Sequence, residues 1–116
     1  MPEVPFLADT AKWLEERWKR IGAKVTINEI PREEIRETAI KNRDYQMLLF
    51  GNILSPSGDL FSFWHSSERF YPGLNLSLYN NKKADQLIEN VRQDFDEEDR
   101  REEFKELQWL IAGEYP

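Results

Sequence analysis

The sequence has no cysteine, only one histidine and no long apolar run. Without cysteine the chain has no disulfide, no thiolate metal ligand and no cysteine nucleophile. His65 lacks a second histidine with which to hold a metal ion, so we expect no metal site and no cofactor. The first six residues have neither a basic start nor an apolar core, and no window reaches the roughly 18 apolar residues of a membrane span. We therefore expect a soluble chain without a signal peptide.

Charge and size exclude further classes. The net charge is −6, and 16 basic residues are spread among 22 acidic ones. An acidic surface of this kind argues against nucleic acid or an anionic membrane as a partner. The 116 residues suffice for one domain with a single core, but not for two lobes with a cleft between them. With 40% hydrophobic residues, the chain should be globular.

The first half of the chain reads as helix, strand, helix, strand. Apolar residues spaced three and four apart predict a helix over 7–21, and Gly22 is a residue type that commonly ends one. Residues 23–30 are rich in β-branched side chains and alternate, which predicts a strand ending at Pro31. A short helix should follow Pro31. The apolar run 45–50 suits a strand covered on both faces, completing a βαβ unit.

A polar loop containing glycine and proline follows that run, over residues 51–59. Ligands of α/β proteins bind beyond the carboxyl ends of strands, so this loop is the candidate binding site. An ordinary surface loop is the alternative reading. Trp64 and its aromatic neighbours could pack in the core under the loop or form a stacking platform for a ligand.

The second half is predicted to be mainly helical. We expect a helical turn at 60–65, a turn at Pro72 and Gly73, and a helix over 82–94 whose apolar face includes Phe95. The acidic run 94–99 lacks the glycine and spacing of a calcium loop, so Asp96 is read as the N-cap of a last helix. A further interpretation is an acid/base hydrolase that uses Asp59 and His65. The sequence contains no nucleophile motif, which argues against this interpretation.

Four separated motifs recur in one order along nearly the whole chain. They are Ile21 to Val25; Arg43 to Gly51; Asn75, Tyr79, Asn80, Asp85, Leu87 and Ile88; and Asp96, Arg100, Phe104, Gln108, Leu110, Ile111, Glu114 and Pro116. Through them the sequence resembles the C-terminal lobe of the extracytoplasmic solute-binding proteins of family 5, which serve ABC importers of oligopeptides, dipeptides and nickel. The resemblance implies a non-enzymatic fragment, residues 1–116, of one ligand-binding lobe of a larger two-lobed protein.

The fold implied is α/β, a small mixed sheet with a βαβ unit and flanking helices, within a class II periplasmic-binding-protein-like lobe. The full protein would close two lobes over a peptide, sugar or metal complex and deliver it to a membrane permease in the periplasm or outside the cell. Ligand-binding residues are then expected at Phe50, Gly51, Asn52, Ile53, Leu54, Ser55, Asp59 and Trp64.

Two positions depart from the family pattern. Peptide-binding members often place Trp directly after the glycine and Asp three residues further, where this chain has Asn52 and Ser55. A neutral serine cannot give a charge-assisted hydrogen bond to a peptide's amino terminus. Asp85 and Arg100 match family positions on helices and are expected to be structural. The alternative from another class is a self-contained α/β interaction module that forms a homodimer through exposed aromatics and strand edges.

Overall fold

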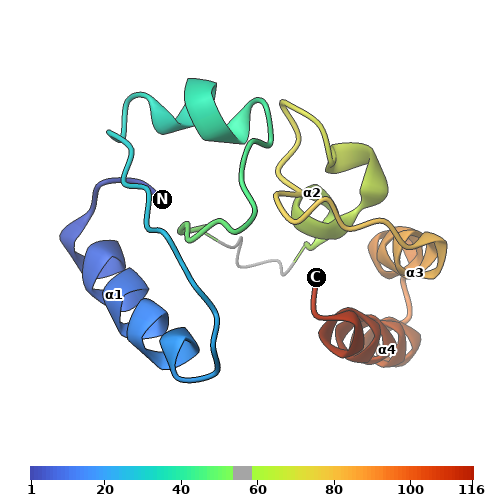
Figure 1. Ribbon diagram of the computed structural model, residues 1–116. Helices are drawn as coiled ribbons and strands as arrows, with labels where there is room; N and C mark the ends of the chain where they lie inside the picture. The colour runs from blue at the N-terminus through green and yellow to red at the C-terminus, as the bar shows by residue number, and fades with distance from the viewer. Residues whose placement is uncertain (54–58) are drawn as a thin grey trace. The chain divides into compact units, whose positions relative to one another are not determined.

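The computed structural model describes residues 1–53 and 59–116, in two compact units, Met1–Ile53 and Leu54–Pro116 (Figure 1). The elements are α1 (Pro5–Lys19), η1 (Arg36–Ile40), α2 (Phe61–Trp64), η2 (Ser66–Glu68), α3 (Lys82–Gln93) and α4 (Glu97–Glu114). Helix η1 is a single turn of π-helix and η2 a 3-10 turn. The first unit thus holds α1 and η1, and the second holds the remaining helices.

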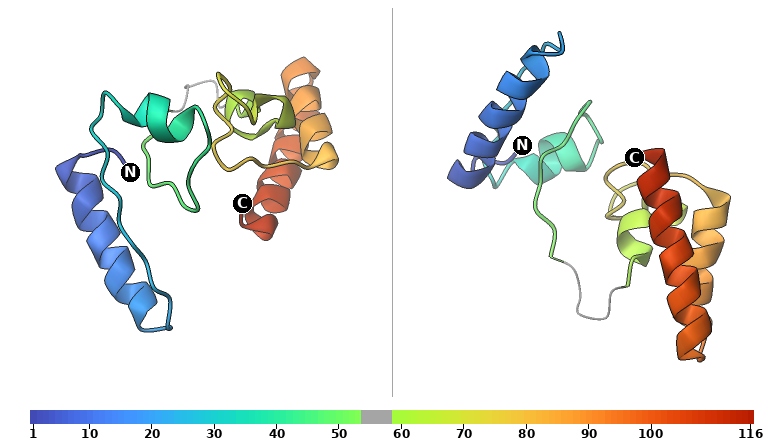
Figure 2. Two further views of the ribbon diagram at one scale, coloured as in Figure 1. Left: turned by 45° about the horizontal axis from the view of Figure 1, so that its top comes forward. Right: turned by 90° about the horizontal axis from the view of Figure 1, so that it is seen from below.

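Helix α1 forms where the apolar spacing predicts it. Pro5 occupies the first turn, where its missing N–H costs nothing, and Arg17 and Lys19 lie in the last turn, where cations favour the helix dipole. Gly22 then adopts a φ of 85°, a left-handed conformation that glycine takes without strain. The chain reverses there and runs back along α1 as an extended segment (Figures 1 and 2).

The prediction of an α/β fold is wrong for the described residues. Neither 23–30 nor 45–50 forms a strand, and the pairing found there is a single parallel bridge between Pro2 and Ile30. A β-strand exists only when its N–H and C=O groups pair with a neighbour, and an unpartnered extended segment is not stable as a strand. The expected helix after Pro31 is reduced to turns and η1. The described residues therefore form no βαβ unit and no sheet.

The second unit is a helical assembly, and its helices begin where the sequence predicts. Asn81 caps α3 by accepting from the N–H groups of Lys83 and Ala84. Asp96 caps α4 by accepting from the N–H groups of Glu98 and Asp99, at 2.8 and 3.2 Å. The capping interpretation of Asp96 is confirmed. Helices α3 and α4 pack side by side, as Figures 1 and 2 show.

The apolar faces of α3 and α4 enclose the core of the second unit. Its buried members are Tyr79, Ala84, Leu87, Ile88 and Leu107, and the partly buried Leu60, Phe61, Trp64, Leu110 and Ile111 pack against them. Phe95 was predicted on this face but is 99% exposed, because α3 ends at Gln93. In the first unit the buried hydrophobic residues are Ala11, Ile35 and Ala39, so its interior is much thinner.

Candidate functional site

The predicted ligand-binding residues of the first unit lie on its surface. Phe50 is 36% exposed and Ile53 96% exposed, while Gly51 and Asn52 between them are also exposed. A Cβ at Gly51 would meet open space. This segment is therefore accessible to a solute.

The remaining predicted site residues belong to the second unit or to no described part. Asp59 Oδ1 accepts from the Phe61 N–H at 3.0 Å, and its Oδ2 lies 3.6 Å from Arg92 Nε. Trp64 meets Tyr79 edge to face, with ring centroids 5.9 Å apart, and packs against the core. Packing against the core therefore explains the position of the Trp64 side chain. Leu54 and Ser55 lie outside the described residues, so a single site formed by 50–55, Asp59 and Trp64 stays a prediction.

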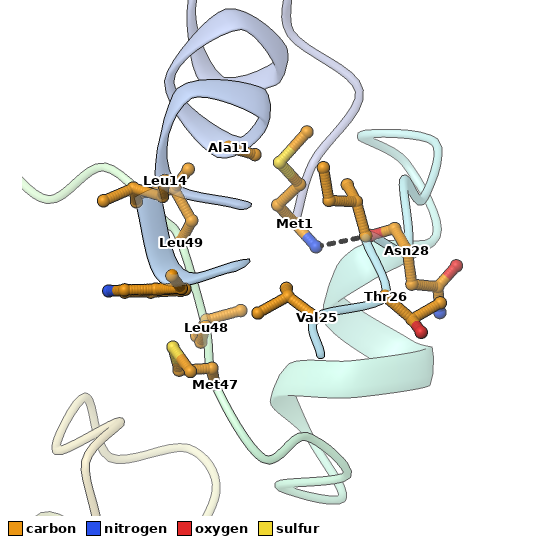
Figure 3. Close-up of a pocket in the computed structure, with 11 residues that line it drawn as sticks. Met1, Ala11, Leu14, Val25, Thr26, Asn28, Met47, Leu48 and Leu49 are labelled. Carbon is orange, nitrogen blue, oxygen red and sulfur yellow. Dashed lines mark hydrogen bonds between the residues drawn. The ribbon is translucent and has the colours of Figure 1, made fainter. Parts of the chain in front are cut away.

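The first unit contains an apolar groove of about 260 Å³, shown in Figure 3. Helix α1 lines one side with Ala11, Leu14 and Trp18, and the extended segments 25–28 and 47–49 line the others, with Met1 at one end. A second cavity of about 300 Å³ is lined by 24–26, Asn28, Ala39 and 44–48. Six residues line both: Met1, Val25, Thr26, Asn28, Met47 and Leu48. These cavities could not be predicted from the sequence because separate segments of the chain line them.

Asn75 organises the loop region of the second unit. Its side chain is fully buried, and its Nδ2 donates to the carbonyls of Tyr79, His65 and Trp64 at 2.9, 3.1 and 3.3 Å. Its Oδ1 accepts from the Tyr79 N–H at 3.0 Å and from Ser77 Oγ at 3.3 Å. A buried amide with these partners fixes the loop relative to α2. From the sequence, Asn75 could be identified only as a position in one of the four family motifs.

A polar cluster around His65 connects the loop to α3. Asp85 accepts from the N–H and Oγ of Ser66, at 2.8 and 2.6 Å, which confirms its structural interpretation. The Ser67 N–H donates to His65 Nδ1 at 3.2 Å, so the proton lies on Nε2, which donates to Glu89 at 3.2 Å. These bonds give His65 a structural role.

Burial and stacking also shape this region. Phe61 stacks on the His65 ring, with centroids 4.3 Å apart and planes 17° apart. The Arg92 guanidinium lies over Phe61, 4.5 Å from the ring centroid. Burial raises the pKa of Tyr79 above the ordinary range of tyrosine, which keeps its phenol neutral. The side chains of this cluster therefore stabilise the folded loop and do not form an open reactive site.

The described residues hold no group of three or more His, Cys, Asp or Glu side chains able to bind a metal ion. Among the same residues, no helix is both long enough and apolar enough to cross a membrane.

Comparison with known proteins gives one significant match, to a binding protein for oligopeptides. The chain is 28% identical over 109 residues to the oligopeptide-binding protein AppA of Bacillus subtilis (strain 168). The match covers 93% of this chain and 20% of that protein, so the chain spans about a fifth of its relative. No family profile matches the chain. No solved structure matches it either.

The likeness supports the resemblance in its coarse form. A relative named as an oligopeptide-binding protein agrees with a solute-binding class. The four motifs on which the resemblance rests extend from Ile21 to Pro116, and a match over 93% of the chain is broad enough to include most of that span.

Proposed function

We propose that this chain is part of the substrate-binding component of an ABC importer and contributes to a cleft that binds an extracellular peptide or peptide-like solute. The observation that carries the proposal is the 109-residue likeness to an oligopeptide-binding protein. In this proposal the chain is a fragment of the C-terminal lobe, and the larger protein closes two lobes over the solute and presents it to a permease outside the cytoplasm.

The exposed segment Phe50–Ile53 is the proposed solute-facing part. Its glycine and asparagine offer backbone and amide groups that can hydrogen-bond a peptide main chain, and Phe50 and Ile53 offer apolar surface for its side chains. Ser55 at the position where peptide binders often carry Asp lowers the expected preference for a free amino terminus. The proposed ligand is therefore a peptide held mainly through neutral contacts.

A chimera tests the proposal. The matched segment of the Bacillus relative is replaced by this chain, and binding of a defined set of oligopeptides is measured by titration calorimetry. We expect binding, and we expect Asn52→Ala to weaken it about 5- to 10-fold, since one neutral hydrogen bond contributes roughly 1 kcal/mol. Glu16→Ala, on the exposed surface of α1, is the matched control and should leave affinity unchanged. A folded chimera that binds none of the peptides would refute the proposal.

A second candidate is the self-contained interaction module that forms a homodimer. Large apolar side chains on the surface favour it: Phe95 is 99% exposed, Ile21 80% and Trp109 73%. Light scattering on the chain and on the chimera separates the two readings. A module keeps its dimeric state in both settings, whereas a lobe fragment gives a monomeric chimera.

A further inference from the structure

The two ring nitrogens of His65 have partners on two different elements. The Ser67 N–H, at the start of η2, donates to Nδ1 at 3.2 Å, so the His65 side chain caps that turn. The other nitrogen, Nε2, donates to Glu89 Oε1 on α3 at 3.2 Å. A neutral imidazole accepts at one nitrogen and donates at the other, and this arrangement uses both. The residue is 9% exposed, so protein groups rather than bulk water surround the ring.

The turn that His65 caps contacts the loop that follows it. The Glu68 N–H donates to the His65 carbonyl at 3.0 Å, and the Asn75 N–H donates to the Glu68 carbonyl at 3.0 Å. Gly73 approaches the same carbonyl so closely that a Cβ at this position would overlap it. The conformation of η2 therefore helps to position Gly73 and the buried Asn75.

Protonation changes the hydrogen bonding at one end of the ring only. A histidinium carries a proton on each nitrogen and accepts at neither. The bond from Nε2 to Glu89 persists, whereas Nδ1 and the Ser67 N–H become two donors facing each other. Ser67 Oγ, 2.9 Å from Nδ1, can accept from the new proton. Because Ser67 is exposed, its released N–H can turn to water.

The charges around the ring favour this local exchange over expulsion of the ring. Besides Glu89, Asp85 on α3 lies 3.9 Å from Nε2, and its carboxylate is held by two bonds from Ser66. Both carboxylates attract a charged imidazole and keep it in place. The other charged groups next to the ring or its direct contacts are Arg92 over Phe61, Asp59 beside Arg92, Glu68 beside Ser67 and Arg69 on the Ser66 carbonyl.

We propose that His65 is a pH-dependent cap of η2. With a neutral ring, Nδ1 holds the Ser67 N–H; with a charged ring, Nδ1 binds Ser67 Oγ, the N–H is released, and the contact of η2 with Gly73 and Asn75 loosens. Histidine is the side chain that ordinarily changes charge between about pH 5 and pH 8. The inference goes beyond the proposed function, because it concerns the second unit alone and involves no solute.

NMR on the chain between about pH 8 and pH 5, without any solute, tests the proposal. The imidazole nitrogen shifts report the tautomer and charge of His65, and amide exchange, corrected for its intrinsic pH dependence, reports the Ser67 N–H. At about pH 8 we expect the proton on Nε2. As the ring titrates, protection of the Ser67 amide should fall at least about fivefold, the factor expected for one hydrogen bond. The amides of Leu87 and Ile88, within α3, should keep their protection.

His65→Asn is the matched control variant. Asparagine is a common cap whose side-chain oxygen accepts from an N–H group but does not titrate in this range. We expect the variant to protect the Ser67 amide equally at both pH values. The titration of the unmodified chain decides the question even if the variant does not fold.

Four results would overturn the inference. The first is unchanged protection of Ser67 while His65 titrates and α3 stays folded. The second is a neutral ring with its proton on Nδ1. The third is a ring that stays neutral until the α3 amides lose their protection. The fourth is the same pH-dependent loss in a folded His65→Asn variant, which would assign the effect to another group.

Discussion

Replacing Asn75 by alanine should destabilise the second unit more than any other single polar substitution considered for it. The side chain is fully buried and hydrogen-bonds the carbonyls of Trp64 and His65 and both the N–H and the carbonyl of Tyr79. Alanine cannot replace these bonds. The buried N–H and carbonyl of Tyr79 would each lose a partner.

The magnitude follows from the number of buried groups left unpaired. An unsatisfied buried donor or acceptor costs about 1–3 kcal/mol. Three buried bonds would be lost, but the His65 carbonyl keeps the Glu68 N–H as a donor, so the groups that lose their partner are the N–H and the carbonyl of Tyr79. We expect a loss of about 3–4 kcal/mol in the free energy of unfolding. With a urea slope of about 1 kcal/mol per molar for a small unit, the midpoint should fall by about 3 M or the unit should be unfolded in water.

Urea unfolding followed by tryptophan fluorescence measures this loss. Trp13 and Trp18 belong to the first unit, so a background with both changed to phenylalanine reports on the second through Trp64 and Trp109. Ser77→Ala is the control, because the exposed Ser77 donates to the same Asn75 oxygen while the buried bonds persist. It should cost less than about 0.5 kcal/mol. A loss below about 1 kcal/mol for Asn75→Ala would refute the reasoning.

Three other substitutions have expected outcomes. Gly73→Ala should cost about 2 kcal/mol in urea unfolding, because a Cβ there would overlap the backbone carbonyl of Glu68; an unchanged midpoint would contradict this close approach. Asp96→Ala should lower stability by about 1 kcal/mol and fray the start of α4 in amide exchange, since two N–H groups lose their acceptor; Glu97→Ala, beside it, is the control. Ser55→Asp in the chimera should strengthen binding of peptides with a free amino terminus relative to their acetylated forms, by roughly 10-fold for one charge-assisted bond. Equal affinity for the two peptide forms would show that the side chain at position 55 does not contact the amino terminus of the bound peptide.

The helices could be predicted from the sequence because their hydrogen bonds are local. Leu7, Ala11, Leu14 and Trp18 repeat at helical spacing, and Asp96 marks the start of α4, so both length and boundary are encoded within the segment itself. The alternation of residues 23–30 encodes only an extended backbone. Whether such a segment becomes a strand depends on a partner elsewhere, which its own residues do not specify.

The candidate sites show the same difference between local and nonlocal information. The exposure of residues 51–53 follows from a glycine and an asparagine after an apolar run, while their role in binding stays a prediction. The groove could not be located, since it requires α1, residues 25–28 and residues 47–49 to meet. The role of Asn75 was equally inaccessible, because its partners lie up to 11 residues away and only the folded loop brings them to one amide.

In the proposed function, this chain supplies part of a peptide-binding cleft and is not by itself the complete site. Calorimetric titration of the same oligopeptides into the isolated chain and into the chimera with the Bacillus relative tests it most directly. We expect no measurable binding by the isolated chain and saturable binding by the chimera. Tight binding by the isolated chain, or a folded chimera that binds no peptide, would contradict it.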